Sequence, residues 1–226
     1  MKKIILIQSR LSSSRFPKKM ISKITKNITL VEYVYNRSKV SKEADNVVII
    51  TSNENSDDEL YNLCLQKNIP IFRGDLNNVL SRYIKAGEYY NSSTICRVCG
   101  DSPFVDVNLI DKMFINMKSE ELEYITIKNC LNGFVSEIID LKTLKNISKI
   151  TNKQDDLEHV TKYIVDNITK FKHKMIDSNL RPNDLKNITL TVDYESDLNL
   201  TKKVISYLNG FDFTSNNIID ILREIK

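Results

Sequence analysis

Short, β-branched apolar runs alternate with amphipathic segments through the first half of the chain, and this alternation constrains the fold more than any other sequence feature. Each apolar run is bounded by polar residues, as is typical of a buried parallel strand. The predicted strands are Lys3–Gln8, Val47–Thr51, Pro70–Phe72 and Thr94–Val98. The helices predicted between and after them span residues 30–40, 57–66, 78–90 and 107–117. Strands that alternate with helices predict right-handed βαβ units and a largely parallel sheet.

The alternation loosens after Glu123. Further strands are predicted at Ile125–Ile127, Phe134–Ile139, Lys172–Ile176 and Ile188–Val192. Further helices are predicted at Leu141–Ile147, Leu157–Ile168, Leu198–Leu208 and Asn216–Glu224. No linker-like stretch and no internal repeat divides the 226 residues, a length that suits one domain. We therefore expect a single α/β domain over residues 1–226, with a mostly parallel sheet flanked by helices and a smaller α+β lobe around residues 128–186.

Composition excludes several classes of protein. Hydrophobic residues make up 41% and charged residues 27%, which is ordinary for a globular domain and excludes a mostly disordered chain. No apolar run approaches the roughly 20 residues that span a bilayer, and Met1–Ser9 becomes polar too soon for a signal peptide. We therefore expect a cytoplasmic protein without a membrane partner. The net charge of +4 is scattered along the chain, so it fits an anionic small ligand as well as nucleic acid.

The cysteines raise one alternative. Cys64, Cys96, Cys99 and Cys130 are expected to be free thiols in a reducing compartment. Cys96 and Cys99 form a CxxC pair, which is compatible with redox chemistry or zinc binding. No second CxxC or nearby histidine completes a metal site, and the surrounding residues predict a buried strand. We therefore expect this pair to be structural.

A polar, basic loop, Ser9–Lys19, follows the first predicted strand. Ligands of open α/β sheets bind beyond the carboxyl ends of the strands, which is where this loop would lie. Its arginines, lysines and serines offer charge and hydrogen-bond donors that suit phosphate oxygens. A solvated basic loop explains the same residues, and no glycine-rich Walker or dinucleotide pattern is present.

Two aspartates, Asp101 and Asp193, each come just after a predicted strand. Carboxylates at the tips of parallel strands can converge across a cleft, and Mg²⁺ prefers such oxygen ligands together with phosphates and water. Each aspartate is also a good turn or helix-cap residue. The residues alone therefore leave open whether each aspartate binds a metal or only caps a turn or helix. Arg73 follows a short predicted strand at the same sheet edge, which favours a nucleotide contact.

Several segments, correctly ordered along the chain, carry a family resemblance. They are residues 10–19, Phe72–Asp75 with Val79–Tyr83, Cys96–Pro103, Gly133 with Glu137, Glu158–Ile164, and Leu190–Asp193. Together they resemble the CTP-dependent cytidylyltransferases that activate acidic sugars such as 3-deoxy-octulosonate and sialic-type acids, and especially the spore coat polysaccharide biosynthesis (SpsF-type) branch. The loop departs from the family pattern at Lys18, where glycine is expected, and at Phe16, where leucine is expected.

The resemblance implies a Rossmann-like nucleotidyltransferase fold, CTP and a small anionic acceptor as substrates, and Mg²⁺ as cofactor. It implies metal binding by Asp101 and Asp193, and catalytic roles for Arg15, Lys19 and Asp101. The nucleotide-binding residues that it implies are Gln8, Arg10, Ser12, Ser13, Ser14, Arg15, Lys19, Thr51, Ser52, Arg73 and Gly100. Glu137, Glu158 and His159 are the implied acceptor-binding residues, although the last two suit packing of the smaller lobe equally well. A homodimer formed through residues 128–186 is also implied, and the apolar pattern around Phe134 supports it.

The expected reaction is transfer of CMP from CTP to an acidic sugar with release of pyrophosphate, for surface glycan biosynthesis. A first alternative is a CDP-forming cytidylyltransferase that acts on a sugar phosphate, alditol phosphate or phosphonate. A second is a glycosyltransferase-like protein that binds a nucleotide sugar without activating it. No recognisable nucleic-acid motif is present, so we expect no nucleic-acid partner.

Overall fold

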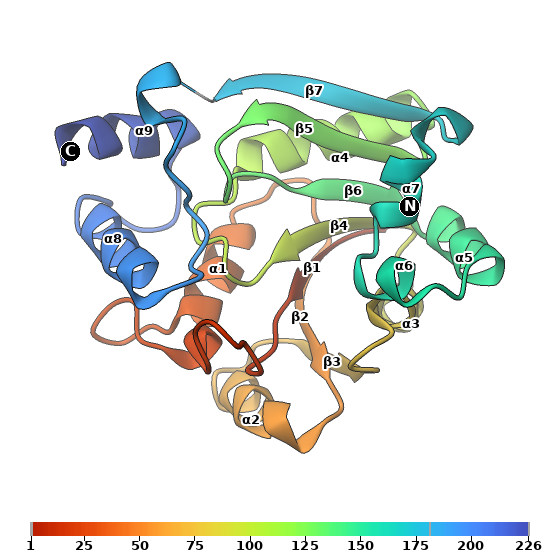
Figure 1. Ribbon diagram of the computed structural model, residues 1–226, viewed down its shortest axis with the longest axis horizontal. Helices are drawn as coiled ribbons and strands as arrows, with labels where there is room; N and C mark the ends of the chain where they lie inside the picture. The colour runs from red at the N-terminus through yellow and green to blue at the C-terminus, as the bar shows by residue number, and fades with distance from the viewer. Residues whose placement is uncertain (1, 181, 226) are drawn as a thin grey trace.

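The computed structural model describes residues 2–180 and 182–225, and it contains one seven-stranded sheet with the order β3-β2-β1-β4-β6-β5-β7 (Figure 1). The strands are β1 (Lys3–Gln8), β2 (Asn46–Ser52), β3 (Ile71–Gly74), β4 (Thr94–Cys99), β5 (Tyr124–Cys130), β6 (Glu137–Asp140) and β7 (His173–Leu180). Every neighbouring pair is parallel except the two that involve β6. The predicted α/β class with a mostly parallel sheet is confirmed.

Helices cover both faces of the sheet because successive strand residues point to opposite sides. Ile5 and Ile7 of β1 lie in one hydrophobic core, and Ile4 and Leu6 lie in the other. The first core is covered by α1 (Leu30–Ser38), α2 (Asp58–Gln66), α4 (Val107–Ser119), α8 (Glu195–Ile205) and α9 (Ser215–Glu224). The second is covered by α3 (Val79–Tyr89), α5 (Leu141–Ile150), α6 (Gln154–Glu158) and α7 (Lys162–Asp166). Short 3₁₀ turns lie at Lys19–Ile21, Asn55–Asp57, Ile168–Lys170 and Asn183–Leu185.

The predicted helix over residues 157–168 is wrong, because the chain breaks at His159 between α6 and α7. His159 has a non-helical backbone with φ −102° and ψ 76°. The break buries Val160 completely and lets the Thr161 hydroxyl donate a hydrogen bond to Glu137 on β6 at 3.1 Å. Tertiary contacts therefore override the helical pattern of this segment.

Two predicted strands also differ from the structure. The strand predicted from Phe134 starts only at Glu137, because Gly133, with φ 103°, turns the chain first. Residues 188–192 form no named strand and make only an isolated bridge, between Thr189 and Asn132. That segment instead crosses the end of the sheet, where it shapes the site described below.

Residues 128–186 contribute β6 and β7 to the same sheet as the N-terminal strands, so a separate lobe stays a prediction. The apolar residues that suggested a dimer surface there are mostly used inside the chain. Phe134, Ile138 and Ile139 are completely buried, and only Val135 is partly exposed. Among the described residues, no helix combines the length and the apolar character needed to cross a membrane.

The strand order reverses direction at β1, which has β2 on one side and β4 on the other. The chain leaves β1 and β4 at the same sheet edge, with Gln8 opposite Cys99 in the ladder. Open α/β sheets bind ligands in the crevice beyond such a reversal point. The topology therefore directs attention to the loops after Gln8 and Cys99.

Candidate active site

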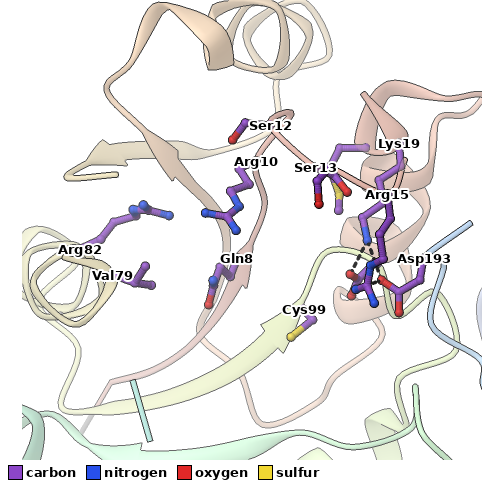
Figure 2. A pocket seen from close by; sticks show the side chains of 13 residues that line it. Gln8, Arg10, Ser12, Ser13, Arg15, Lys19, Val79, Arg82, Cys99 and Asp193 are labelled. Atoms are coloured by element: carbon purple, nitrogen blue, oxygen red, sulfur yellow. Dashed lines mark hydrogen bonds and ion pairs between the residues drawn. The ribbon is translucent and has the colours of Figure 1, made fainter. Parts of the chain in front are cut away.

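A cavity of about 480 Å³ lies at the carboxyl ends of β1 and β4 (Figure 2). Its walls are Gln8, Arg10, Ser12, Ser13, Ser14, Arg15, Lys19, Met20, Val79, Arg82, Cys99, Asp101 and Asp193. Figure 2 shows two groups of side chains, with Gln8, Arg10, Val79 and Arg82 in one and Arg15, Lys19 and Asp193 in the other.

The loop after β1 is held in place by a buried carboxylate. The backbone N–H of Leu11 donates to Asp57 Oδ1 at 2.7 Å, and Asp57 is completely buried at the start of α2. The carbonyl of Leu11 in turn accepts hydrogen bonds from the N–H groups of Ser13 and Lys18. These bonds fold residues 11–18 into a compact loop whose serines and arginines line the cavity.

Lys19 joins the two predicted metal ligands. Its ammonium donates to Asp101 Oδ2 at 2.7 Å, to Asp193 Oδ1 at 3.3 Å and to the carbonyl of Val192 at 2.7 Å. The residue is only 6% exposed, so these contacts are made with little solvent screening. Because both carboxylates contact one nitrogen atom, aspartates 92 positions apart converge at one point, as the sequence predicted.

Main-chain hydrogen bonds bring Asp193 to Asp101. The N–H of Val192 donates to the carbonyl of Asp101 at 2.9 Å, and the N–H of Leu190 donates to the carbonyl of Asn132 at 2.8 Å. Gly133 makes this approach possible, because a Cβ there would lie 2.7 Å from the backbone of Leu190. The segment before Asp193 is therefore fixed on both sides by backbone bonds, which set the position of its carboxylate.

The donor set fits a hard divalent cation. Asp101 and Asp193 supply carboxylate oxygens at one point, and Mg²⁺ is commonly bound by one or two carboxylates together with substrate phosphates. Among the described residues, no cluster of three or more histidine, cysteine, aspartate or glutamate side chains could hold a metal ion.

Cations outnumber carboxylates around the cavity. Arg10, Arg15, Lys19 and Arg82 face two aspartates. Arg15 donates to Asp193 at 2.7 Å, yet its side chain is 56% exposed and so is free to reach a ligand. Such a positive surplus favours a polyanion such as a triphosphate.

Arg82 lies in the cavity wall but was not among the predicted nucleotide contacts. It is 1% exposed, and its guanidinium donates to the carbonyls of Asp75 and Leu76. Burial lowers the pKa of this guanidinium, which nevertheless stays charged at neutral pH. The residue therefore fixes the turn before α3 while adding positive charge to the cavity.

The predicted residues that line the cavity are Gln8, Arg10, Ser12, Ser13, Ser14, Arg15, Lys19, Asp101 and Asp193. Four predicted nucleotide contacts do not line it. Thr51 and Ser52 are completely buried at the end of β2, and Ser52 donates to Asp57. Gly100 lies behind the wall, where a Cβ would sit 2.2 Å from the hydroxyl of Ser9.

Arg73 is the fourth, and its guanidinium is already engaged. It donates to the carbonyls of Ser52 and Glu54, pairs with Asp58 at 2.7 Å and lies over the Tyr61 ring. These contacts tie the end of β3 to the start of α2. Arg73 therefore stabilises the segment between β2 and α2, and it does not line the cavity.

The predicted acceptor residues separate in the structure. Glu137 lines a second, adjoining cavity, whereas Glu158 and His159 line neither. Glu158 lies 3.9 Å from Arg10 at the rim, and His159 faces Asp155 at 3.6 Å with 61% of its side chain exposed. His159 thus ends α6, and its acceptor-binding role stays a prediction.

The CxxC pair is divided between the two faces of the sheet. Cys96 is completely buried in the first core, while Cys99 lines the cavity on the opposite face. Both thiols are free, and burial raises the pKa of Cys99, so it is a neutral thiol at physiological pH. A shared metal or a disulfide is therefore excluded by strand geometry. Cys99 itself, with Met20 and Val79, is a wall residue that sequence reasoning missed.

Comparisons with known proteins agree with this geometry. A family model described as Cytidylyltransferase matches residues 4–216. The spore coat polysaccharide biosynthesis protein SpsF of Bacillus subtilis is 32% identical over 201 residues, which cover 85% of this chain and 83% of that protein. The 3-deoxy-manno-octulosonate cytidylyltransferase of Christiangramia forsetii is 24% identical over 179 residues, 75% of this chain and 70% of that protein.

Among solved structures, a cytidylyltransferase from Leptospira borgpetersenii superposes with a TM-score of 0.92 and 29% identity. The superposition covers 100% of this chain and 95% of that one. Because the family model spans nearly the whole chain, including both aspartates and the basic loop, the protein belongs to the cytidylyltransferase family and is a CTP-dependent nucleotidyltransferase.

Proposed function

We propose that the enzyme transfers CMP from CTP to a hydroxyl of an acidic sugar, of the ulosonic or sialic type, and releases pyrophosphate for surface glycan biosynthesis. The observation that carries the proposal is the contact of Lys19 with both Asp101 and Asp193 inside a cavity rich in cations. The names of two relatives, one in spore coat polysaccharide biosynthesis and one acting on 3-deoxy-manno-octulosonate, support the acceptor class. Because CTP is the donor, we place the reaction in the cytoplasm.

In this proposal the basic loop binds the triphosphate. Arg10 and Arg15 pair with phosphate oxygens, and the hydroxyls of Ser12, Ser13 and Ser14 donate to them. Lys19 exchanges a carboxylate contact for a phosphate oxygen and so keeps its charge at the reacting group. A Mg²⁺ ion bound by Asp101 and Asp193 would neutralise phosphate charge in the transition state.

The transfer itself is an in-line displacement. The acceptor oxygen attacks the α-phosphorus of CTP, the bond from that phosphorus to the oxygen bridging to the β-phosphorus breaks, and pyrophosphate leaves with the bonding electrons. The acceptor proton passes to solvent. Positioning and charge neutralisation by the residues around Lys19 supply the rate enhancement.

A product-mass experiment tests this function. The enzyme is incubated with CTP, Mg²⁺ and each member of a panel that contains 3-deoxy-manno-octulosonate, N-acetylneuraminate and several sugar phosphates. We expect pyrophosphate release and the mass of a CMP ester with an acid, and no turnover in chelator. A CDP-linked product formed only from a sugar phosphate would overturn the acceptor class.

Three variants test the site in the same assay. Asp101→Asn and Asp193→Asn should each lower kcat by about 100-fold or more, because a neutral amide binds Mg²⁺ poorly. Arg15→Ala should raise the KM for CTP by about tenfold or more, the effect of losing charge-assisted hydrogen bonds. Asp220→Asn, on the exposed side of α9, is the control that should leave activity unchanged. Full activity in either aspartate variant of the cavity would contradict the metal assignment.

A further inference from the structure

The ammonium group of Lys19 has no hydrogen-bond donor to spare. An ammonium carries three N–H donors, and here they are directed to Asp101 Oδ2 and the Val192 carbonyl, both at 2.7 Å, and to Asp193 Oδ1 at 3.3 Å. Figure 2 shows Lys19, Arg15 and Asp193 gathered on one side of the cavity. The ammonium therefore occupies the point at which the two carboxylates converge.

The charges of this cluster balance without any added ion. Arg15 donates to the same oxygen of Asp193, Oδ1, at 2.7 Å, and the hydroxyl of Thr191 donates to the other oxygen at 3.4 Å. The two positive charges of Lys19 and Arg15 thus match the two negative charges of the aspartates. The side chain of Lys19 is almost completely buried and those of the aspartates are largely buried, so solvent screens these interactions only in part.

A divalent cation bound by Asp101 and Asp193 would contact carboxylates that already accept hydrogen bonds from Lys19. Like charges a few ångströms apart repel strongly in a partly buried site. Lys19 and a metal ion therefore compete for the two aspartates, unless a polyanion draws the ammonium away from them.

The side chain of Lys19 can move while its backbone stays in place. Lys19 begins the 3₁₀ turn Lys19–Ile21, in which the N–H groups of Ile21 and Ser22 donate to the carbonyls of Lys18 and Lys19. The four-carbon stem of a lysine is flexible, and Lys19 lines the cavity together with Arg15. A triphosphate bound there offers the ammonium new acceptors within the same cavity.

We propose that Lys19 is an internal counter-ion that excludes a divalent cation from Asp101 and Asp193 until the nucleotide binds. The triphosphate supplies the negative charge that draws the ammonium from the carboxylates. The enzyme therefore takes up the metal ion together with the nucleotide and does not bind the free metal ion first. This inference rests on the proposed function, in which the two aspartates bind the metal ion, and it adds an order of binding to that function.

Binding of Mn²⁺ tests the proposal without turnover. Free Mn²⁺ is measured by electron paramagnetic resonance while the protein is titrated, first without nucleotide and then with a CTP analogue whose α- and β-phosphorus atoms are joined by a methylene group. A titration of the analogue alone corrects for the Mn²⁺ that it binds in solution.

The variants change the charge at residue 19. Lys19→Met removes the charge and keeps a similar chain length, whereas Lys19→Arg keeps the charge. Lys3→Met is the matched control, because Lys3 is also a mostly buried lysine paired with a carboxylate, that of Glu43, but lies at the other end of β1.

Without nucleotide, we expect Lys19→Met to bind Mn²⁺ at least about tenfold more tightly than the wild type, the size of effect that an adjacent charge has on the proton affinity of a carboxylate. Addition of Asp193→Asn to Lys19→Met should abolish this gain. Lys19→Arg and Lys3→Met should bind Mn²⁺ as weakly as the wild type. Mn²⁺ should also raise the thermal midpoint of Lys19→Met and leave that of the wild type unchanged.

A second comparison needs no lysine variant, so it decides the question even if Lys19→Met does not fold. Asp101→Asn should leave the weak Mn²⁺ binding of the nucleotide-free protein unchanged and should weaken Mn²⁺ binding once the analogue is present. A loss of Mn²⁺ binding in the nucleotide-free protein would show that the carboxylates bind a metal ion beside Lys19, which overturns the proposal.

The outcomes separate this proposal from the proposed function. If Asp101→Asn and Asp193→Asn leave Mn²⁺ binding unchanged even with the analogue, the metal assignment fails and this proposal fails with it. If the aspartates bind Mn²⁺ in the presence of the analogue but Lys19→Met gains no affinity in its absence, the proposed function stands and only the role given to Lys19 is overturned.

Discussion

At the scale of single residues, Lys18 shows how a departure from a family pattern is accommodated. The residue occupies the position where glycine is expected, and it has a left-handed backbone with φ 58° and ψ 17°. Such a conformation costs a non-glycine residue about 1–2 kcal/mol. Lys18 also forms an exposed ion pair with Glu59 at 2.5 Å. This pair offsets only part of the backbone cost, because surface ion pairs typically stabilise a protein by less than about 1 kcal/mol.

Lys18→Gly should therefore leave the free energy of unfolding unchanged or raise it by up to about 1 kcal/mol, since relief of the backbone offsets the flexibility of glycine. Activity should be retained. Lys18→Ala is the control, because it loses the same ion pair but keeps the Cβ. Chemical denaturation measures both variants, and an equal loss of stability in the two would show that the left-handed backbone carries no strain.

At the scale of elements, the approach of residues 189–193 to the sheet end decides whether the two aspartates meet. Gly133 is where the two segments come closest. It has a positive φ of 103°, and a Cβ added to it would clash with the backbone of Leu190. Displacement of this segment would move Asp193 relative to Asp101, because the hydrogen bond from Val192 to the Asp101 carbonyl lies between them.

Gly133→Ala should destabilise the protein by about 2–4 kcal/mol, from the positive φ and from the clash with backbone, and should lower kcat more than it raises the KM for CTP. Gly210→Ala is a matched control, because Gly210 also has a positive φ, 88°, but no atom lies within 4 Å of its Cβ position. That control should lose only about 1–2 kcal/mol and keep full activity. Equal effects of the two substitutions on kcat would contradict the role given to the 189–193 segment.

At the scale of the whole molecule, the proposed homodimer needs a surface other than the buried apolar residues around Phe134. Within residues 128–186, β7 is the last strand of the sheet, and no described strand pairs with its outer edge. Met175 on this strand is 51% exposed. Unpaired edges with exposed apolar side chains are common sites of strand pairing between subunits.

We therefore expect a dimer mass, about twice 26.2 kDa, by light scattering at micromolar concentration. Met175→Lys should shift the mass toward the monomer, because a lysine on an edge opposes strand pairing. Ile115→Lys serves as control, since Ile115 is 52% exposed on α4, outside this region. A monomer mass for the wild-type protein would remove the dimer proposal.

The sequence by itself determined much of this protein. The periodicity of Lys3–Gln8, Val47–Thr51 and Thr94–Val98 predicted three adjacent parallel strands correctly, because a buried parallel strand must be apolar on both faces. The same logic located the loop after Gln8 and Asp101 after β4, which line one cavity, whereas the strand expected before Asp193 does not form.

Only the tertiary structure decided the rest, because the deciding contacts join residues far apart in the chain. The sequence favoured Arg73 as a nucleotide contact, yet Arg73 is held outside the cavity by Asp58, while Arg82, inside a helix, lines it. Lys19 meets both aspartates because backbone hydrogen bonds bring Val192 to Asp101, an approach that no local pattern encodes. Periodicity reports which face of an element is buried, but the partner that each polar group finds depends on how the elements pack.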